Sequence, residues 1–295
     1  MPSDNVYQEE RIPSQLERFW RSYRDNNLSM FGLWCLIATI LVTLLSPWIM
    51  PFDPIEQSTK LLMPPSWSPD GTVENFLGTD DLGRDILSRI IDGTRLSFGA
   101  ALVITAIAMM IGSVIGILAG VTKGLLSSTL NHLLDTVMSI PSLLLAIIFV
   151  AFLGPGEFNI LLAICLALIP RFIRTIYVAV HAEIAKDYIM AARLDGANDF
   201  YLVWNSILPN ILAIIAAEVT FALSVAILDI TALGFLGLGA QAPSSEWGAM
   251  LGDAAELLYL APWTVVLPGL AILYVVVVIN IVGEGIRSAL NAGIE

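Results

Sequence analysis

The sequence predicts an all-α polytopic membrane protein with six transmembrane helices. Apolar residues make up 57% of its 295 residues, charged residues make up only 14%, and the mean hydropathy is +0.79. A soluble globule of this length needs a more charged surface. Each of six apolar runs is about 20 residues long, which lets a helix cross ~30 Å of hydrocarbon. The runs cover residues 30–50, 97–121, 133–153, 158–176, 211–233 and 263–282.

The first 29 residues are polar and contain no short apolar core followed by a small-residue cleavage site. They are therefore not a signal peptide, and residues 30–50 are expected to stay as an uncleaved first span. Cys35 and Cys165 both lie within apolar runs. This placement indicates two small core residues rather than a disulfide or a metal pair.

The distribution of Lys and Arg orients the chain. Of 14 such residues, four lie between the first and second spans, and all others lie on the side that holds the N-terminus. The positive-inside tendency then places both termini and residues 181–210 in the cytoplasm. The expected divisions are an N-terminal segment 1–29, a first span 30–50, an outer segment 51–96, a core of five spans 97–285 that includes residues 181–210, and a C-terminal tail 286–295.

Residues 51–96 form a long connection on the outer face. Five prolines keep its first half extended. From Asp80 or Asp81 we expect a short amphipathic helix with an Asp85–Arg89 pair at i, i+4. Two interpretations of this helix remain open, namely a lid that packs only on the spans and a contact surface for another protein.

Small residues and a proline shape two of the spans. Gly112, Gly116 and Gly120 recur at four-residue intervals in the second span. Such a stripe favours close packing of a second helix. Pro141 lies inside the third run and is expected to kink its helix.

The longest polar interruption between spans is residues 181–210, HAEIAKDYIMAARLDGANDFYLVWNSILPN. Helix-forming residues predict a first helix over residues 183–194. Gly196 follows where a helix C-terminus favours a residue that tolerates left-handed φ. A plain connector between two spans needs far fewer residues, as the turn at 154–157 indicates.

A second helix is expected after the glycine bend. Asn198 or Asp199 can cap it. It would cover residues 200–208, which are apolar and aromatic, and Pro209 is expected to end it because proline cannot continue the hydrogen-bond ladder.

The side chains of this element suggest a docking site for another protein. Ala191, Ala192 and Gly196 are small enough to let a partner approach closely, and Tyr201 and Trp204 are aromatic anchors of the kind that fill a partner's groove. The alternative is an amphipathic helix that lies on the membrane surface without a partner.

Three acidic residues lie within spans, where charge is costly and needs a partner. Glu218 is in the middle of its span, and either lines a substrate path, where an acid would suit a cationic cargo, or pairs inside the bundle. Asp135 and Asp229 lie near the ends of their spans. Both are candidates for the substrate path, although structural pairing is the commoner role at such positions.

Several functions are excluded by composition and motifs. The net charge of −12 leaves no basic patch for nucleic acid. The sequence contains no G-x-x-x-x-G-K-[ST] phosphate loop, so the chain cannot be its own ATPase. His132 and His181 lie at span ends without metal-ligand spacing, and we assign no metal and no enzymatic activity. An ion-driven secondary transporter stays open as an alternative, although the sequence lacks the internal repeats such proteins normally have.

Three blocks of sequence resemble the inner-membrane permease subunits of binding-protein-dependent ATP-binding-cassette importers, in the dipeptide, oligopeptide and nickel branch. The blocks are residues 76–97, residues 187–210 and residues 227–254, the last containing FLGLGAQAPSSEWGAML. Within that branch the resemblance is strongest to a subgroup associated with sensitivity to antimicrobial peptides, which residues 143–150 and 193–196 fit.

The resemblance implies a type I ABC importer permease fold, MetI-like, in the lipid bilayer of a bacterial inner membrane, with residues 51–96 in the periplasm. It implies a homologous but distinct second permease subunit in a heterodimer, two ABC ATPase subunits and a periplasmic substrate-binding protein. ATP and Mg would bind to the ATPase subunits, and no cofactor would bind to this chain. Peptides, cationic ones included, are the implied cargo, with polyamine, haem and nickel as alternatives.

The resemblance also assigns roles to individual residues. In that family the loop at residues 181–210 inserts between the lobes of an ATPase subunit. Its expected coupling residues are Asp187, Ala191, Ala192, Arg193, Asp195, Gly196, Trp204 and Pro209. Gly237, Gly239 and Trp247 match a region that forms part of the periplasmic gate, whereas Trp247 could instead belong to the aromatic belt of the membrane interface.

Overall fold

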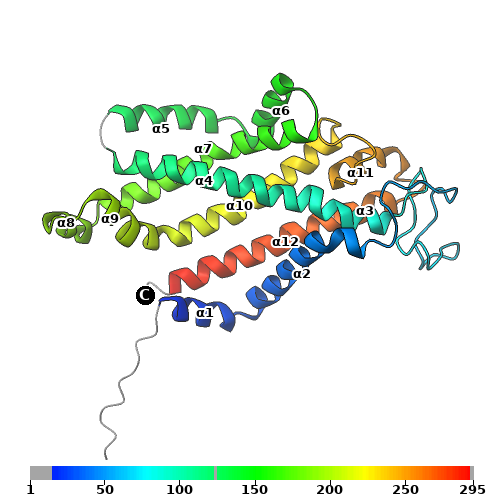
Figure 1. The fold of residues 1–295 in the computed structure, drawn as a ribbon, viewed down its shortest axis with the longest axis horizontal. Coiled ribbons are helices and arrows are strands. Elements are labelled where there is room, and N and C mark those ends of the chain that lie inside the picture. Colours follow the sequence, from blue (N-terminus) through cyan, green and yellow to red (C-terminus); the bar gives the residue numbers. More distant parts are fainter. Residues whose placement is uncertain (1–14, 123–124, 293–295) are drawn as a thin grey trace, which may run out of the picture.

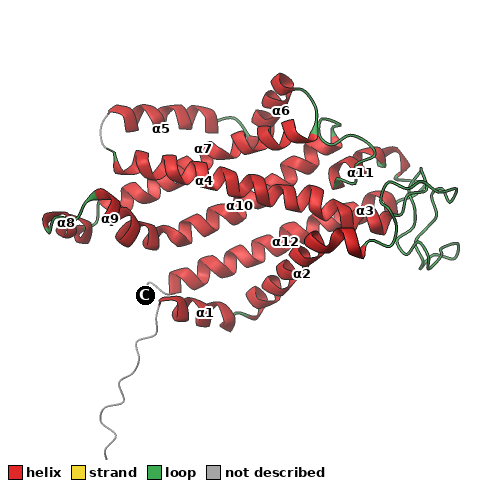
Figure 2. Ribbon diagram, viewed as in Figure 1, coloured by secondary structure: helices red, strands yellow, loops and turns green. Residues whose placement is uncertain are grey.

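The computed structural model describes residues 15–122 and 125–292, which form helices joined by loops (Figure 2). The first half of the expected N-terminal segment and the end of the expected C-terminal tail lie outside the described residues. The helices are α1 (Gln15–Asp25), α2 (Asn27–Ile49), α3 (Ile86–Gly93), α4 (Ala100–Val121), α5 (Leu125–Met138), α6 (Ser142–Leu153), α7 (Glu157–Ile184), α8 (Asp187–Leu194), α9 (Asp199–Leu202), α10 (Leu208–Phe235), α11 (Trp247–Asp253) and α12 (Trp263–Ala292). Short turns lie between them, π-helical in η1 (Thr94–Gly99) and η2 (Val203–Ile207) and 3₁₀ in η3 (Ala255–Leu257).

The long helices α2, α4, α7, α10 and α12 run side by side along the longest axis of the molecule (Figure 1). One end of this bundle carries α8 and α9, together with α1 and the C-terminal end of α12, and we call it the α8 end. The opposite end, the α11 end, carries α3, α11 and the loops of residues 50–85. The N-terminal helix, the 181–210 element and the end of α12 thus lie at the same end of the bundle, as the order of spans predicts.

Five helical stretches are long and apolar enough to cross a bilayer, and they cover Asn27–Ile49, Ile86–Val121, Glu157–Ile184, Asp199–Phe235 and Trp263–Asn291. The run at 133–153 bends at Pro141, where we expected a kink, and the bend is a full break at which α5 and α6 meet at an angle of 91°. Proline has no N–H and disfavours helical backbone at the residue before it. The helix therefore stops before Pro141 and restarts after it, and the two halves are a sixth candidate span when they are counted as one.

The glycine stripe of the second span packs against α7, as predicted. A Cβ on Gly112 would lie 2.4 Å from the Cβ of Phe172, and one on Gly120 would lie 2.7 Å from Cγ1 of Val180. A Cβ on Gly116 would lie 2.9 Å from the carbonyl oxygen of Ile173. The three glycines thus let the two backbones approach to a distance that any larger residue would prevent.

Two apolar clusters hold the bundle together. The larger one joins α4, α6, α7, α10 and α12 and includes the buried rings of Phe98, Phe172 and Trp247. The smaller one lies at the α8 end, where Ile189 of α8 and Leu202 of α9 pack with residues of α7 and α10. The 181–210 element is therefore fixed to two membrane-spanning helices rather than hanging free from them.

The amphipathic helix of the outer segment starts later than predicted. Asp85 is the N-cap of α3 and accepts the N–H of Ser88 at 2.8 Å, so the helix begins at Ile86 rather than near Asp80. The expected Asp85–Arg89 pair is wrong, because a capping carboxylate is turned toward the first helical turn. Arg89 pairs with Asp80 instead.

Candidate functional site

Residues 181–210 form the expected helix, bend and short helix at the α8 end. The first helix is interrupted where α7 ends at Ile184, and α8 begins after Lys186. Gly196 has φ +90°, and the N–H of Ala197 donates to the carbonyl of Ala192 at 3.0 Å. This is the hydrogen-bond pattern of a helix closed by a left-handed residue, so Gly196 sets the bend.

The second helix begins as predicted and continues further. Asn198 caps α9, because its Oδ1 accepts the N–H of Tyr201 at 2.8 Å. Pro209 does not end this helix, since α9 passes through the π-helical turn η2 directly into α10. Pro209 occupies the first turn of α10. Proline is tolerated at this position because the first backbone N–H groups of a helix have no partner within it.

Large apolar side chains of this element point into solvent. Leu194 is 84% exposed, Phe200 is 79% exposed and Trp204 is 64% exposed. Ala191 is also exposed, whereas Ala192 is half-buried. A group of exposed apolar residues at one end of the molecule is typical of a protein interaction site.

Charged residues border this apolar surface. The guanidinium of Arg193 pairs with the Asp199 carboxylate at 2.9 Å, which ties α8 to α9 across the glycine bend. Asp187 lies in the first turn of α8, where its negative charge interacts favourably with the positive end of the helix dipole. Asp195 follows the last turn. Both side chains are exposed and available to a partner.

Tyr188 joins the two halves of the element, a role that the sequence did not suggest. Its hydroxyl donates a hydrogen bond to the buried carboxylate of Glu183 and accepts one from the Asn210 amide at 2.8 Å. The other carboxylate oxygen of Glu183 pairs with Lys186 at 2.8 Å. Burial, followed by the hydrogen bond to Glu183, raises the pKa of Tyr188 to about 12. Tyr188 thus links the end of α7 to the start of α10.

Glu218 is paired inside the bundle. The Arg171 side chain donates to one of its carboxylate oxygens, and the Thr175 hydroxyl donates to the other at 3.0 Å. The guanidinium carbon of Arg171 also lies 3.8 Å from the centroid of the Phe221 ring. Of the two roles open to Glu218, the structure therefore shows pairing.

The other two acids of the spans lie in different surroundings. Asp135 is exposed and pairs with Arg174 at 3.5 Å. Asp229 is buried and has one carboxylate oxygen, Oδ2, without a partner among the described residues. Within the same described part of the chain, no three His, Cys, Asp or Glu side chains are placed to hold a metal ion.

At the α11 end, Trp247 is buried rather than part of an interfacial belt. Its indole N–H donates to the carbonyl of Ile90 at 3.1 Å, and its backbone N–H donates to the Ser97 hydroxyl at the same distance. Ser97 in turn donates to the buried Glu246 carboxylate at 3.0 Å. A Cβ on Gly93 would lie 2.4 Å from the Trp247 ring. α11 is therefore seated directly against α3 and η1.

The expected gate glycines lie just before α11 in sequence. Gly237 has φ +71° with open space around it, so a turn that only glycine adopts easily follows α10. A Cβ on Gly239 would lie 3.0 Å from the Ile160 side chain of α7. The chain between α10 and α11 thus turns close to the start of α7.

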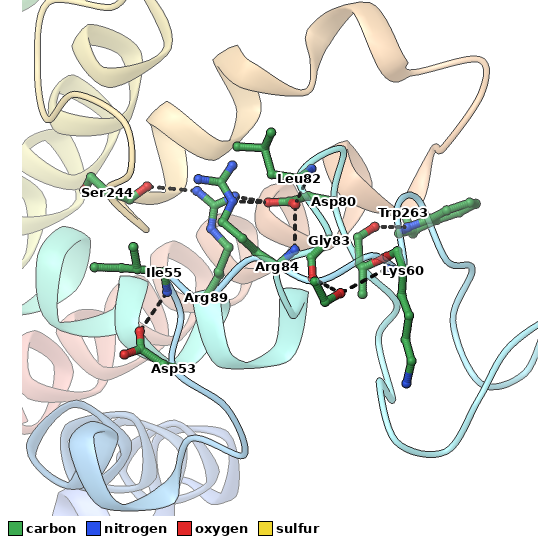
Figure 3. Close-up of polar contacts among 12 residues, drawn as sticks. Asp53, Ile55, Lys60, Asp80, Leu82, Gly83, Arg84, Arg89, Ser244 and Trp263 are labelled. Carbon is green, nitrogen blue, oxygen red and sulfur yellow. Dashed lines mark hydrogen bonds and ion pairs between the residues drawn. The ribbon is translucent and has the colours of Figure 1, made fainter.

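A buried charge cluster, which sequence reasoning missed, fixes the outer segment to this end (Figure 3). The carboxylate of Asp80 pairs with the guanidinium of Arg84 at 2.6 Å and with that of Arg89. Arg89 also donates to the carbonyl of Ser244 at 2.9 Å. Because Ser244 lies two residues before Glu246, the capping residue of α11, the cluster connects the outer segment to the candidate gate.

Comparisons with known proteins agree with this architecture. A family described as "Binding-protein-dependent transport system inner membrane component" matches residues 112–295, and one described as "N-terminal TM domain of oligopeptide transport permease C" matches residues 14–65. The first of these covers more than half of the chain.

Two curated relatives are similar over nearly their whole length. The peptide transport system permease protein SapC of Salmonella typhimurium is 52% identical, with 100% of both chains covered. The di/tripeptide transport system permease protein DppC of Pseudomonas aeruginosa is 43% identical, covering 95% of this chain and 92% of the relative.

A solved structure resembles the fold. A chain of the MetNI methionine ABC transporter in an inward-facing conformation has a TM-score of 0.58 at 20% identity, covering 70% of this chain and 97% of that chain. The similarity confirms the MetI-like importer fold. The chain belongs to the family of inner membrane components of binding-protein-dependent transport systems, and it is a multi-pass permease subunit of an ABC transporter that works with separate ATPase subunits.

Proposed function

We propose that this permease moves peptides, cationic ones included, across the bacterial inner membrane. The observation that carries the proposal is its 52% identity over the full length to a peptide transport system permease, far above the similarity that a shared fold alone requires. The pathway lies between this chain and a homologous but distinct second permease subunit.

The 181–210 element is the docking site for an ATPase subunit. Its exposed apolar residues, above all Trp204 and Leu194, supply the buried centre of such an interface, and Asp187 and Asp195 supply charges at its rim. Two ATPase subunits bind ATP and Mg. The same proposal places the α8 end in the cytoplasm, in line with the excess of Lys and Arg on that side.

Contacts within the element support transmission of force to the membrane. A push on α8 reaches α7 through Glu183 and reaches α10 through Asn210, because Tyr188 bonds to both. The Arg193–Asp199 pair and the bend at Gly196 keep α8 and α9 at a fixed angle. Closure of the ATPase subunits would thereby tilt two spans together.

The α11 end carries the periplasmic gate and receives a substrate-binding protein. Trp247 supports the proposal because its ring is held between α3 and α11, while Gly237 and Gly239 supply the flexible turn that precedes α11. Opening requires α11 to move relative to α10, and the Ser97–Glu246 hydrogen bond would pass that motion to α4.

Reconstitution tests the cargo. The permease, its sister permease and the ATPase subunits are placed in proteoliposomes with the cognate periplasmic binding protein, and ATP-dependent uptake of a labelled cationic peptide is measured. Uptake that unlabelled peptides abolish supports the proposal. Uptake that only a polyamine, haem or nickel abolishes would replace peptides by that cargo.

A further inference from the structure

A cavity of about 240 Å³ opens where the bent span changes direction. It lies between the junction of α5 and α6 and the facing sides of α7 and α10. Its lining is Val137, Met138, Ile140, Pro141, Ser142, Leu145, Ala167, Leu168, Pro170, Arg171, Phe221 and Val225. The break at Pro141 creates this space, since a straight helix over the same residues would bring side chains into it.

The charge that this cavity offers is positive. Both carboxylate oxygens of Glu218 are already engaged, one by Arg171 and the other by Thr175, and Glu218 is only 7% exposed. The Arg171 side chain is 40% exposed and uses its Nε for Glu218. A guanidinium has five N–H donors, so the two terminal nitrogens of Arg171 can still bind an anion.

The cavity lies between groups of opposite charge, with the Arg171 guanidinium of α7 at one end and the Asp229 carboxylate of α10 beyond the other. Phe221 and Val225 line the cavity, with Glu218 and its partner Arg171 before them and Asp229 one turn after them. At 1.5 Å per residue, Asp229 lies roughly 16 Å along the axis from Glu218. Ser142 lines the cavity, and Oδ2 of Asp229 has no partner in the described part of the chain. An anion is therefore attracted to the Arg171 end and repelled from the Asp229 end.

We propose that this cavity binds the C-terminal carboxylate of the peptide cargo, with the Arg171 guanidinium as its partner. The proposal rests on the proposed function and specifies which chemical group of the cargo the membrane site recognises. A cavity of this volume is smaller than typical ligand pockets of about 300–1,000 Å³, so it receives the end of a peptide rather than a whole one. Arg171 lies midway along α7, about 20 Å from either end, where no lipid phosphate resides.

The test compares two peptides of one sequence, one with a free C-terminal carboxylate and one with a C-terminal amide. Their initial uptake rates are measured in the reconstituted transporter with the same binding protein, and the acid-to-amide ratio is the readout. Because the binding protein is the same in every assay, a change in this ratio between variants reflects a change in how the permease recognises the peptide. Loss of this charge-assisted bidentate contact should lower the ratio by about tenfold to a hundredfold.

The informative variant is the double substitution Arg171→Gln with Glu218→Gln, which leaves no buried unpaired charge. Arg171→Lys keeps the cation and the ion pair but loses the planar fork, so its ratio should fall between those of the wild type and the double variant. Arg174→Gln is the matched control, because Arg174 lies one turn further along α7 and does not line the cavity.

Three results would overturn the inference: an unchanged ratio in the Arg171 variants, an equal loss in Arg174→Gln, or a wild type that shows no preference for the free acid. The proposed function fails separately, if the wild-type transporter takes up neither peptide.

Discussion

The Tyr188 hydroxyl holds the buried Glu183 carboxylate at the junction between α7 and α8. Replacing Tyr188 with Phe leaves one oxygen of a carboxylate that is only 5% exposed without this donor. We expect a loss of about 1–3 kcal/mol in stability, together with a lower ratio of cargo-stimulated to basal ATPase activity. Thermal unfolding in detergent and ATPase assays of the reconstituted complex measure the two effects. Tyr201→Phe is the control, since the exposed Tyr201 hydroxyl forms no hydrogen bond with any described residue, and an equal effect of both variants would contradict this role for Tyr188.

Tyr188 should ionise at unusually high pH. Burial and the hydrogen bond to Glu183 raise its pKa to about 12, so the folded protein favours the neutral phenol. The stability contributed by this neutral form is fully present below the ordinary tyrosine pKa of about 10 and is lost as the pH rises from there toward 12. Titration of tyrosinate absorbance in wild type and Tyr188→Phe isolates this group by difference. A difference spectrum with a midpoint near 10 would refute the assigned environment.

Loss of the Asp80 carboxylate from the buried charge cluster at the α11 end should destabilise the protein strongly. Asp80→Asn leaves the two buried arginines, Arg84 and Arg89, without their shared carboxylate (Figure 3). Breaking a buried ion pair in this way costs about 3–5 kcal/mol, so we expect poor yield of folded protein and a markedly lower melting temperature. The neighbouring Asp81 is exposed, and Asp81→Asn should behave like the wild type. Equal stability of the two variants would mean that the cluster does not anchor the outer segment.

Gly196→Val tests backbone conformation alone. No atom lies within 4 Å of the position a Cβ would take, so any effect comes from the φ of +90°. The strain is on the order of 1–2 kcal/mol, and we expect transport and cargo-stimulated ATPase activity to fall together while membrane insertion is kept. Gly269→Val is the control, because Gly269 also has open space around it and lies inside α12. Wild-type coupling in Gly196→Val would show that the bend is not needed.

Features written in local sequence were predicted well. The apolar runs predicted the candidate spans, and Gly196 predicted the bend. Asn198 was predicted as a helix cap, and the stripe from Gly112 to Gly120 was predicted as a packing face. Each depends on the residue type and its near neighbours, which a single sequence displays.

Features that depend on distant partners could not be predicted. Arg171 and Glu218 are 47 positions apart, and only the packing of α7 against α10 shows that they pair. Arg89 was assigned to Asp85 by helical spacing, yet Asp80 reaches it because the preceding loop folds back. Pro209 was taken for a helix end because a π-helical turn leaves no recognisable signal in the sequence.

Crosslinking from Trp204→Cys tests the central claim most directly, namely that the 181–210 element docks on an ATPase subunit. The variant is made in a chain whose two native cysteines, Cys35 and Cys165, are replaced, and Val73→Cys at the α11 end is the control, since Val73 is 86% exposed. We predict that Trp204→Cys forms a crosslink to an ATPase subunit in the assembled complex and that Val73→Cys does not. Labelling of Trp204→Cys by a membrane-impermeant reagent from outside intact cells, or crosslinks from it to lipid alone, would contradict the account.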